Sequence, residues 1–309
     1  MMTDYFINIV VFMTIVPDKD HCKTGTVTKN ISLLKQFYWF YKSIKKNWNK
    51  FPNRITVIHS VDYSDKDKEF LDKLDIDIIK TESDLINPKY IWNNSLQRYI
   101  VPTKIKGTHR LICECDQLAI SNIAFNYEVD FQAGYEHVCI FDKNTVDKIA
   151  KYFNLKSLPY QTGITINNFI KYNYKKVDHN KINPYFNNGC IFIKEDFAKK
   201  FYHHMLPLKR EIYSDNFLKD KIGVHNTNLN EYMHFCGQLV TSLQLVSLTD
   251  NWKPLPIGCN FLINICDVPN IKINKSIISH VHYCGQRGYS NILKYYPEYF
   301  QEKYYNEAK

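Results

Sequence analysis

Two carboxylates separated by one residue, Glu114 and Asp116, follow an apolar run at positions 111–113 in the stretch HRLICECDQLAIS. Two acids this close repel each other unless a cation or a set of hydrogen-bond donors neutralises their charge. A hard divalent ion such as Mg²⁺ or Mn²⁺ would do so, because it prefers a few carboxylates together with the oxygens of a substrate phosphate. The pair is therefore typical of a metal–phosphate site, and equally of a solvated turn.

The position of this acid pair favours the first interpretation. In a chain with 31 acids in 309 residues, about three such pairs are expected by chance. Glu114 and Asp116, however, follow a fully apolar segment that is typical of a strand in a parallel sheet. Ligands of such sheets bind at the carboxyl ends of the strands. The position therefore predicts a ligand site.

A second group of polar side chains lies in the stretch SHVHYCGQRGYS near the C-terminus. His280 and His282 are two residues apart on a strand pattern, so their side chains are expected on the same face. A loop with Gly285 and Arg287 is expected to follow. A histidine here can give an imidazole to a metal, and the arginine can give a guanidinium to a diphosphate. One imidazole among oxygen ligands favours Mn²⁺ over Ca²⁺.

The elements that must position these residues alternate between strands and helices in the first half of the chain. β-branched and apolar runs predict strands, and apolar residues at helical spacing predict helices. The expected strands are 6–16, 54–61, 76–80 and 110–113, and the expected helices are 30–48, a short one around 70–74, and 92–101. This alternation indicates an α/β fold with a mainly parallel central sheet covered by helices on both faces.

The second half of the chain is less regular. The expected strands are 186–193, 243–249 and 276–283, and the expected helices are 196–206 and 228–239. Because no repeat and no Gly/Ser linker interrupts the chain, a single domain over 1–309 is expected. Its parts are a nucleotide-binding half (1–130), a half that completes the metal and acceptor sites (131–290) and a docked C-terminal helix (291–309).

The composition narrows the functional classes. The net charge of +9 is spread without a long block of one sign, which argues against a nucleic-acid-binding arm. None of the nine cysteines forms a CxxC pair, and Cys113, Cys139 and Cys190 lie inside apolar runs. Buried reduced thiols are typical of a reducing compartment, so the cytoplasm is expected. The apolar run at 6–16 is too short to span a membrane, and no transmembrane segment is expected.

At this point the chain resembles retaining glycosyltransferases of the GT-A fold, most of all glycosyltransferase family 8, which includes glycogenin and the bacterial lipopolysaccharide galactosyl- and glucosyltransferases. The resemblance runs from about Asn94 to Tyr289 as an ordered series of short motifs. SLQRYIVP matches the helix that precedes the metal motif of the family. LICECD matches its LYLDAD metal motif, so Glu114 and Asp116 take the Asp-x-Asp positions.

Three further motifs follow in the order of the family. YFNNGCIFI matches the acceptor-side YFN(S/A)G motif, LPIGCNF matches a turn that contains Leu255, Pro256 and Asn260, and HYCGQRGYS matches the final HYxG…KPW motif. The resemblance implies metal ligands at Glu114, Asp116 and His282. It implies donor binding at Thr14, Val16, Arg98, Glu114, Cys115, Gly285 and Arg287. It implies that the side-chain amides of Asn187, Asn188 and Asn226 steer the transferred sugar.

The chain departs from the family pattern at three places. Glu114 is one methylene longer than the usual aspartate, which can move its contact from the metal to the donor ribose. HNTNLN replaces the DQDxLN segment, so His225 and Asn226 stand where the family has aspartate and glutamine. Gly288 and Tyr289 replace a Pro-Trp pair, which leaves Arg287 as the cation of that segment.

The implied activity is transfer of a sugar from a nucleoside diphosphate sugar, with a UDP-sugar as the favoured donor, to a hydroxyl of a glycan or glycoconjugate. The implied cofactor is Mn²⁺ or Mg²⁺, and retention of configuration is expected. An inverting transferase would need a general base, for which Asp215 and Glu231 are candidates. A sugar nucleotidyltransferase would need a glycine-rich basic loop after the first strand, which TIVPDKDHCKTG does not supply. A sugar-nucleotide-binding protein without turnover is the remaining alternative.

Overall fold

Four parallel strands form the first part of the central sheet: β1 (Ile7–Phe12), β2 (Asn53–His59), β3 (Asp77–Lys80) and β4 (His109–Cys113). The computed structural model describes residues 5–13, 33–60, 62–82, 96–136, 141–158, 184–214, 216–225, 229–256, 258–263, 276, 278–283 and 285–300. β1 lies between β2 and β4. Its residues from Ile7 to Val11 are fully buried, as expected for a strand that is covered on both faces.

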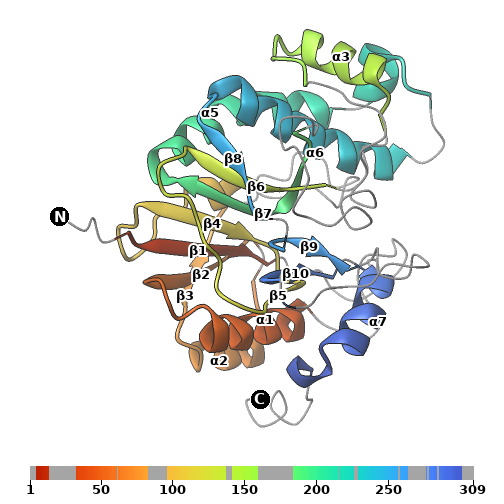
Figure 1. Cartoon of the computed structure of the whole chain (residues 1–309). Helices are drawn as coiled ribbons and strands as arrows, with labels where there is room; N and C mark the ends of the chain where they lie inside the picture. The colour runs from red at the N-terminus through yellow and green to blue at the C-terminus, as the bar shows by residue number, and fades with distance from the viewer. Residues whose placement is uncertain are drawn as a thin grey trace.

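Three strands of the second half complete the sheet. They are β6 (Phe131–Tyr135), β7 (Phe186–Lys194) and β8 (Trp252–Pro254), and the sheet order is β3-β2-β1-β4-β7-β6-β8. β7 runs antiparallel to both of its neighbours, β4 and β6. The two halves of the sequence therefore contribute to one seven-stranded sheet, joined where β4 pairs with β7 (Figure 1).

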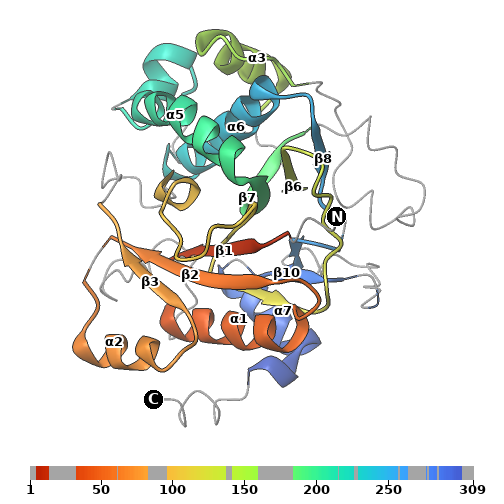
Figure 2. The ribbon, with the colours of Figure 1, turned by 90° about the vertical axis from the view of Figure 1, so that its left-hand side faces the viewer.

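Helices cover both faces of this sheet, as predicted. One face carries α1 (Leu33–Asn47) and α2 (Asp65–Asp72), and the other carries α5 (Glu195–Ile212) and α6 (Leu229–Leu248) (Figure 2). Side chains that alternate along β1 divide between the two cores. Ile9 and Val11 pack with the α1 side, and Val10 packs with the α5 and α6 side.

The described part of the chain has further helical segments. They are the 3₁₀ turn η2 (Leu96–Tyr99), α3 (Lys143–Tyr152), the π-helical turn η5 (Leu218–Ile222), α7 (Gly285–Tyr295) and the 3₁₀ turn η8 (Pro297–Tyr299). Asp142 caps α3 by accepting a hydrogen bond from the Thr145 amide. None of the helices in the described ranges is long and apolar enough to cross a membrane.

A second, three-stranded sheet lies beside the carboxyl end of β4. It consists of β5 (Gln117–Ala119), β10 (His280–His282) and β9 (Phe261–Leu262), with β10 in the middle. Helix α1 supports it, because Ser43 Oγ accepts a hydrogen bond from the Ala119 amide and Asn47 Nδ2 donates to the Ala119 carbonyl. Only three residues separate β4 from β5, so the small sheet begins where the acid pair lies.

Three sequence predictions about elements need correction. Residues 243–249 do not form a strand, because Leu243 and Leu245 lie in α6, where both are fully buried. A helix that is apolar around its circumference loses the periodicity that separates it from a strand. The expected loop at 285–288 is the first turn of α7, and this helix begins six residues before the expected position 291. Of the expected helix at 92–101, the described part is the 3₁₀ turn η2.

Candidate functional site

Strand pairing brings His282 next to the acid pair. In the small sheet, His282 lies opposite Gln117, and the Tyr283 amide donates a hydrogen bond to the Asp116 carbonyl at 3.0 Å. The imidazole Nε2 is consequently 3.2 Å from a carboxylate oxygen of Glu114 and 3.2 Å from one of Asp116. Backbone pairing between segments 166 residues apart thus assembles a two-carboxylate, one-imidazole group.

The composition and burial of this group fit a divalent cation. The three candidate ligand atoms lie within 4.8 Å of one another. The His282 side chain is 1% exposed, whereas those of Glu114 and Asp116 are 27% and 21% exposed. A buried imidazole with two partly exposed carboxylates leaves open coordination positions on the solvent side, where the oxygens of a ligand can bind.

Gly189 on β7 holds the group in place from behind. Its carbonyl accepts hydrogen bonds from the Glu114 amide at 3.2 Å and from Gln117 Nε2. A Cβ atom at this position would lie 2.5 Å from Cε1 and 2.8 Å from Nδ1 of His282. The imidazole therefore packs directly on the backbone of β7, and any larger residue at 189 would displace it.

Beside Gly189, Asn187 connects two strands through its side chain. Asn187 Nδ2 donates to Glu136 Oε2 at 2.8 Å, and its Oδ1 accepts from Asn260 Nδ2 at 3.1 Å. Gln238 of α6 also donates to Glu136 Oε2, at 2.9 Å. Asn260 has a φ of 57°. It packs closely on Gly134, and a Cβ atom added to Gly134 would lie 2.8 Å from Cβ of Asn260. These polar contacts link β6, β7 and the turn before β9.

Glu136 is a site residue that the sequence reasoning missed. It follows the buried strand β6 directly, as Glu114 follows β4, and this position was the available signal. Asn188, on β7, is 8% exposed, and its Oδ1 has no hydrogen-bond partner among the described residues. An unused acceptor in a buried position costs free energy unless a ligand or solvent donor completes it.

Arg98, in the 3₁₀ turn η2, and Cys115, between the two acids in sequence, are both buried inside the protein. Arg98 is 2% exposed, its guanidinium is 5.5 Å from the ring centroid of Tyr99, and its Nε has no hydrogen-bond partner in the described structure. The Cys115 thiol packs into the core, where burial and the nearby charges of Asp116 and Glu114 raise its pKa well above the usual range. The buried Cys115 side chain is therefore not available to a ligand.

The other predicted site residues are only partly placed. Gly285 is the first residue of α7, three positions after His282, and Arg287 is in the first turn of the same helix. Thr14, Val16, Asn226 and the alternative base Asp215 lie outside the described residues. Glu231 is in α6. The structure thus brings together Glu114, Asp116 and His282, with Asn187 on the adjacent strand.

The architecture is that of the GT-A glycosyltransferases: a mixed central sheet flanked by helices, with a small second sheet next to the carboxyl end of its fourth strand. The galactosyltransferase LgtC, solved with donor and acceptor sugar analogues, aligns over 97% of this chain and 94% of its own, with a TM-score of 0.51 and 12% identity. A second LgtC structure, of an active-site mutant, aligns over 90% of this chain and 87% of its own, with a TM-score of 0.50 and 12% identity.

Sequence comparison adds nothing to this result. No protein-family model matches the chain, and no curated protein matches it either. At 12% identity, the structural likeness shows the fold alone. The function therefore depends on the chemistry of the site.

Proposed function

We propose that this protein is a metal-dependent glycosyltransferase that moves a sugar from a nucleoside diphosphate sugar, with UDP-sugar as the favoured donor, to a hydroxyl of a glycan or glycoconjugate. The observation that carries the proposal is the convergence of Glu114, Asp116 and His282 at the carboxyl end of β4 in a GT-A fold. Because the acids come from the first half of the chain and His282 from the second, residues 1–130 and 131–290 act together.

The chemical difficulty of such a transfer is the departure of a diphosphate while the sugar gains positive charge. Mn²⁺ or Mg²⁺, when bound, supplies a Lewis acid for the leaving diphosphate. Asp116 and His282 would hold the ion. Glu114, with its longer side chain, would either share the ion or reach the donor ribose. His282 acts in its neutral form, and its contact with Gly189 keeps the ring in position.

Fixed positive charge near the leaving group comes from two further features. Arg98 is a buried guanidinium whose charge acts on the thiol of Cys113, the last residue of β4, and such a group is electrostatically stronger than one in water. The first turn of α7, which contains Gly285 and Arg287, begins three residues after His282, and the N-terminus of a helix favours anions. Both would stabilise the negative charge that develops on the diphosphate.

We assign contacts with the transferred sugar to the asparagine side chains of β7. Asn187 and Glu136 are already oriented by mutual hydrogen bonding, and Asn188 offers an unused acceptor. A carboxylate fixed by two amide donors is suited to accept hydrogen bonds from sugar hydroxyls. We assign Asn187, Asn188 and Asn226 to steering the sugar, with retention of configuration. The free, buried thiols of Cys113 and Cys190 support a cytoplasmic setting.

The test is a screen of nucleoside diphosphate sugars with Mn²⁺, Mg²⁺ or EDTA, read as thermal shift and as release of nucleoside diphosphate. We expect one nucleotide class to stabilise the protein only when metal is present. Asp116→Asn and His282→Ala should lose this stabilisation, whereas Asp65→Asn, in an exposed acid of α2, should keep it. NMR of the product anomer then separates retention from inversion.

Two results would contradict the proposal. Full turnover in EDTA would remove the role of the metal. Unchanged Mn²⁺-dependent donor binding in both Asp116→Asn and His282→Ala would show that these residues are not the ligands. Metal-dependent donor binding without release of nucleoside diphosphate, for any acceptor tested, would identify a sugar-nucleotide-binding protein instead.

A further inference from the structure

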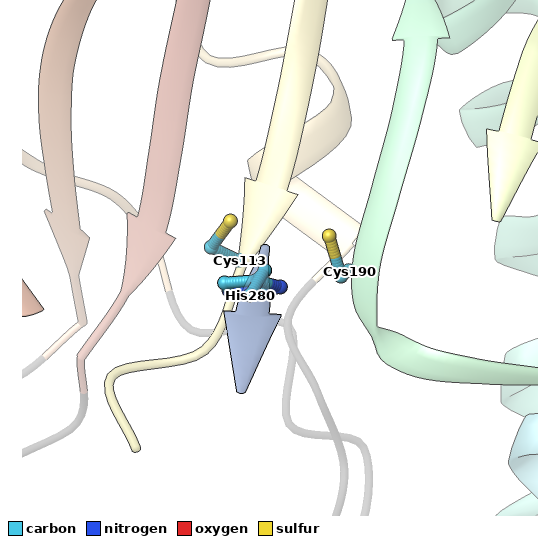
Figure 3. Close-up of side chains that lie close together, drawn as sticks. All are labelled: Cys113, Cys190 and His280. Carbon is cyan, nitrogen blue, oxygen red and sulfur yellow. The ribbon is translucent and has the colours of Figure 1, made fainter. Parts of the chain in front are cut away.

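Directly behind the acid pair, cysteine and histidine side chains from distant parts of the chain meet in the core. Cys113 is the last residue of β4, Cys190 lies opposite it on β7, and His280 begins β10. Their candidate ligand atoms lie within 4.8 Å of one another. Figure 3 shows His280 between the two cysteines, with a ring nitrogen on the side of Cys190.

A third cysteine contacts the same group. Cys259 Sγ is 4.0 Å from Nδ1 of His280, and the Cys259 thiol also interacts with that of Cys190. The Cys190 thiol interacts with that of Cys113 as well. Of the five free cysteines in the described part of the chain, three therefore lie in this one cluster.

The side chains of this cluster are buried, and one ring nitrogen of His280 lacks a hydrogen-bond partner among the described residues. Cys113, Cys190 and His280 are 0% exposed, and Cys259 is 4% exposed. The rings of Phe40 and Trp48 lie 6.0 and 5.4 Å from the imidazole. His280 Nδ1 accepts a hydrogen bond from the Asn260 amide, but its Nε2 has no hydrogen-bond partner among the described residues. A buried ring N–H without an acceptor is costly, which is why such atoms are rare in folded proteins.

We propose that Cys113, Cys190, Cys259 and His280 form a closed structural zinc site. Three thiolates and one imidazole are a ligand set that Zn²⁺ takes in tetrahedral, fully protein-bound sites. Thiolates also select this ion against Mg²⁺ and Mn²⁺, which prefer the oxygen ligands of the adjacent acid pair. The two neighbouring sites would thus bind different metals because one offers sulfur and the other oxygen.

Metal binding requires one change in the local hydrogen bonds. A metal-bound neutral imidazole keeps a proton on its second nitrogen, so Nδ1 must either bind the ion or carry that proton. In both cases the Asn260 amide loses its acceptor on His280. Zinc binding therefore gives up this hydrogen bond and releases the three thiol protons to solvent, and four bonds to a soft cation form in their place.

The zinc would join the two sheets beneath the proposed catalytic site. Cys113 and Cys190 belong to the seven-stranded sheet, His280 belongs to the small sheet, and Cys259 lies in the turn before β9. Each ligand neighbours a residue of the site: Cys113 precedes Glu114, Cys190 follows Gly189, Cys259 precedes Asn260, and His280 is two residues from His282. The site is structural, and it does not depend on the proposed sugar transfer.

The experiment measures zinc in the purified full chain by elemental analysis, after growth with zinc and passage over a chelating resin. We expect about one zinc per chain in the wild type. Cys190→Ser and Cys259→Ser should lose it. Cys236→Ser, a buried cysteine of α6, and Asp116→Asn, in the acid pair, should both keep it. Retention by Asp116→Asn separates this site from the proposed catalytic metal.

Two measurements on the wild type keep the test valid if a cysteine variant fails to fold. Replacement of zinc by Co²⁺ should give the intense visible bands of tetrahedral thiolate coordination. Removal of zinc with a chelator should lower the unfolding temperature, and zinc should restore it. Three results would overturn the proposal: wild-type protein without zinc, zinc retained by Cys190→Ser, or an intact mass two hydrogens lower that shows a disulfide.

Discussion

The two ends of strand β4 carry ionisable residues with opposite characters. At the amino end, Arg110 is 1% exposed and fully engaged: its guanidinium forms two hydrogen bonds with Glu195 and others with the Arg98 and Val101 carbonyls. At the carboxyl end, Glu114 and Asp116 share one imidazole and remain partly exposed. The first arrangement pairs every charge within the fold. The second concentrates acids where a ligand can reach them, and this difference separates a stabilising group from a functional one.

The comparison predicts that the carboxyl end governs activity. Asp116→Asn should reduce sugar transfer about 30- to 1,000-fold, because loss of one group that stabilises the leaving diphosphate costs about 2–4 kcal/mol in the transition state. The unfolding temperature should change little, since the Asp116 side chain is partly exposed. Steady-state kinetics together with thermal denaturation checks both parts. A large loss of stability with preserved turnover would reverse the assignment.

The amino end should show the opposite behaviour. Glu195→Gln leaves the buried Arg110 charge without its carboxylate, and we expect a loss of about 2–3 kcal/mol in the free energy of unfolding. Turnover per folded molecule should be preserved, because about 13 Å of strand separates Arg110 from Glu114. Urea denaturation measures the cost. Asp196→Asn is the control, because its pair with Lys199 is exposed and should contribute less than about 0.5 kcal/mol.

Gly189→Ala tests how closely the His282 ring packs on β7 beside the carboxyl end of β4. The new methyl group would overlap the His282 ring, and overpacking of this kind costs about 1–3 kcal/mol. Donor binding in Mn²⁺ should weaken as well, because the ring must move away from the acids. Gly223→Ala is the matched control: Gly223 has a φ of 79° and open space around it, so stability should fall while metal-dependent binding stays unchanged. Equal metal-dependent donor binding by both variants would show that Gly189 does not hold the His282 ring in position.

His109, the first residue of β4, should make the stability of the protein depend on pH. Burial lowers the pKa of His109 from 6.5 to about 4, while Nε2 donates to the Tyr127 carbonyl and the ring stacks on Phe192. Between these values the unfolded chain binds a proton that the native chain does not. Native stability therefore falls as the pH drops from about 6.5 to 4, by about 1–3 kcal/mol.

His109→Gln should flatten this dependence. The measurement is the free energy of unfolding at pH 4.5 and pH 7 for the wild type, His109→Gln and His203→Gln, an exposed control in α5. An identical slope for all three proteins would show that His109 does not contribute.

The parts of the fold that the sequence predicted are those with long, uniform patterns. β1, β2 and β7 are rich in β-branched and other apolar residues, and the spacing of Phe37, Phe40 and Ile44 predicts α1. β5 and β9 have three and two residues, too few for any periodicity, and neither was predicted. The sequence of the second half of α6 predicts a strand, because burial on all sides removes the polar face that identifies a helix.

The residues of the candidate site also divide into those that the sequence predicts and those that it does not. Glu114, Asp116 and His282 could be selected from residue type, position after a strand and motif order. Glu136 follows a strand, β6, that the sequence did not predict, and its importance depends on the hydrogen bonds of Asn187 and Gln238, which come from two other elements. Arg98 could be selected, but its burial could not be predicted.

Local sequence alone determined the ligand types, the strand after which they lie and the α/β alternation, because these depend on side-chain chemistry and short-range periodicity. Tertiary structure alone decided that His282 meets the acids and that Cys113, Cys190, Cys259 and His280 meet behind them. Those contacts join residues 21 to 168 positions apart, and strand pairing sets them. The physical reason is that pairing between distant strands depends on the packing of the whole chain, which no local pattern records.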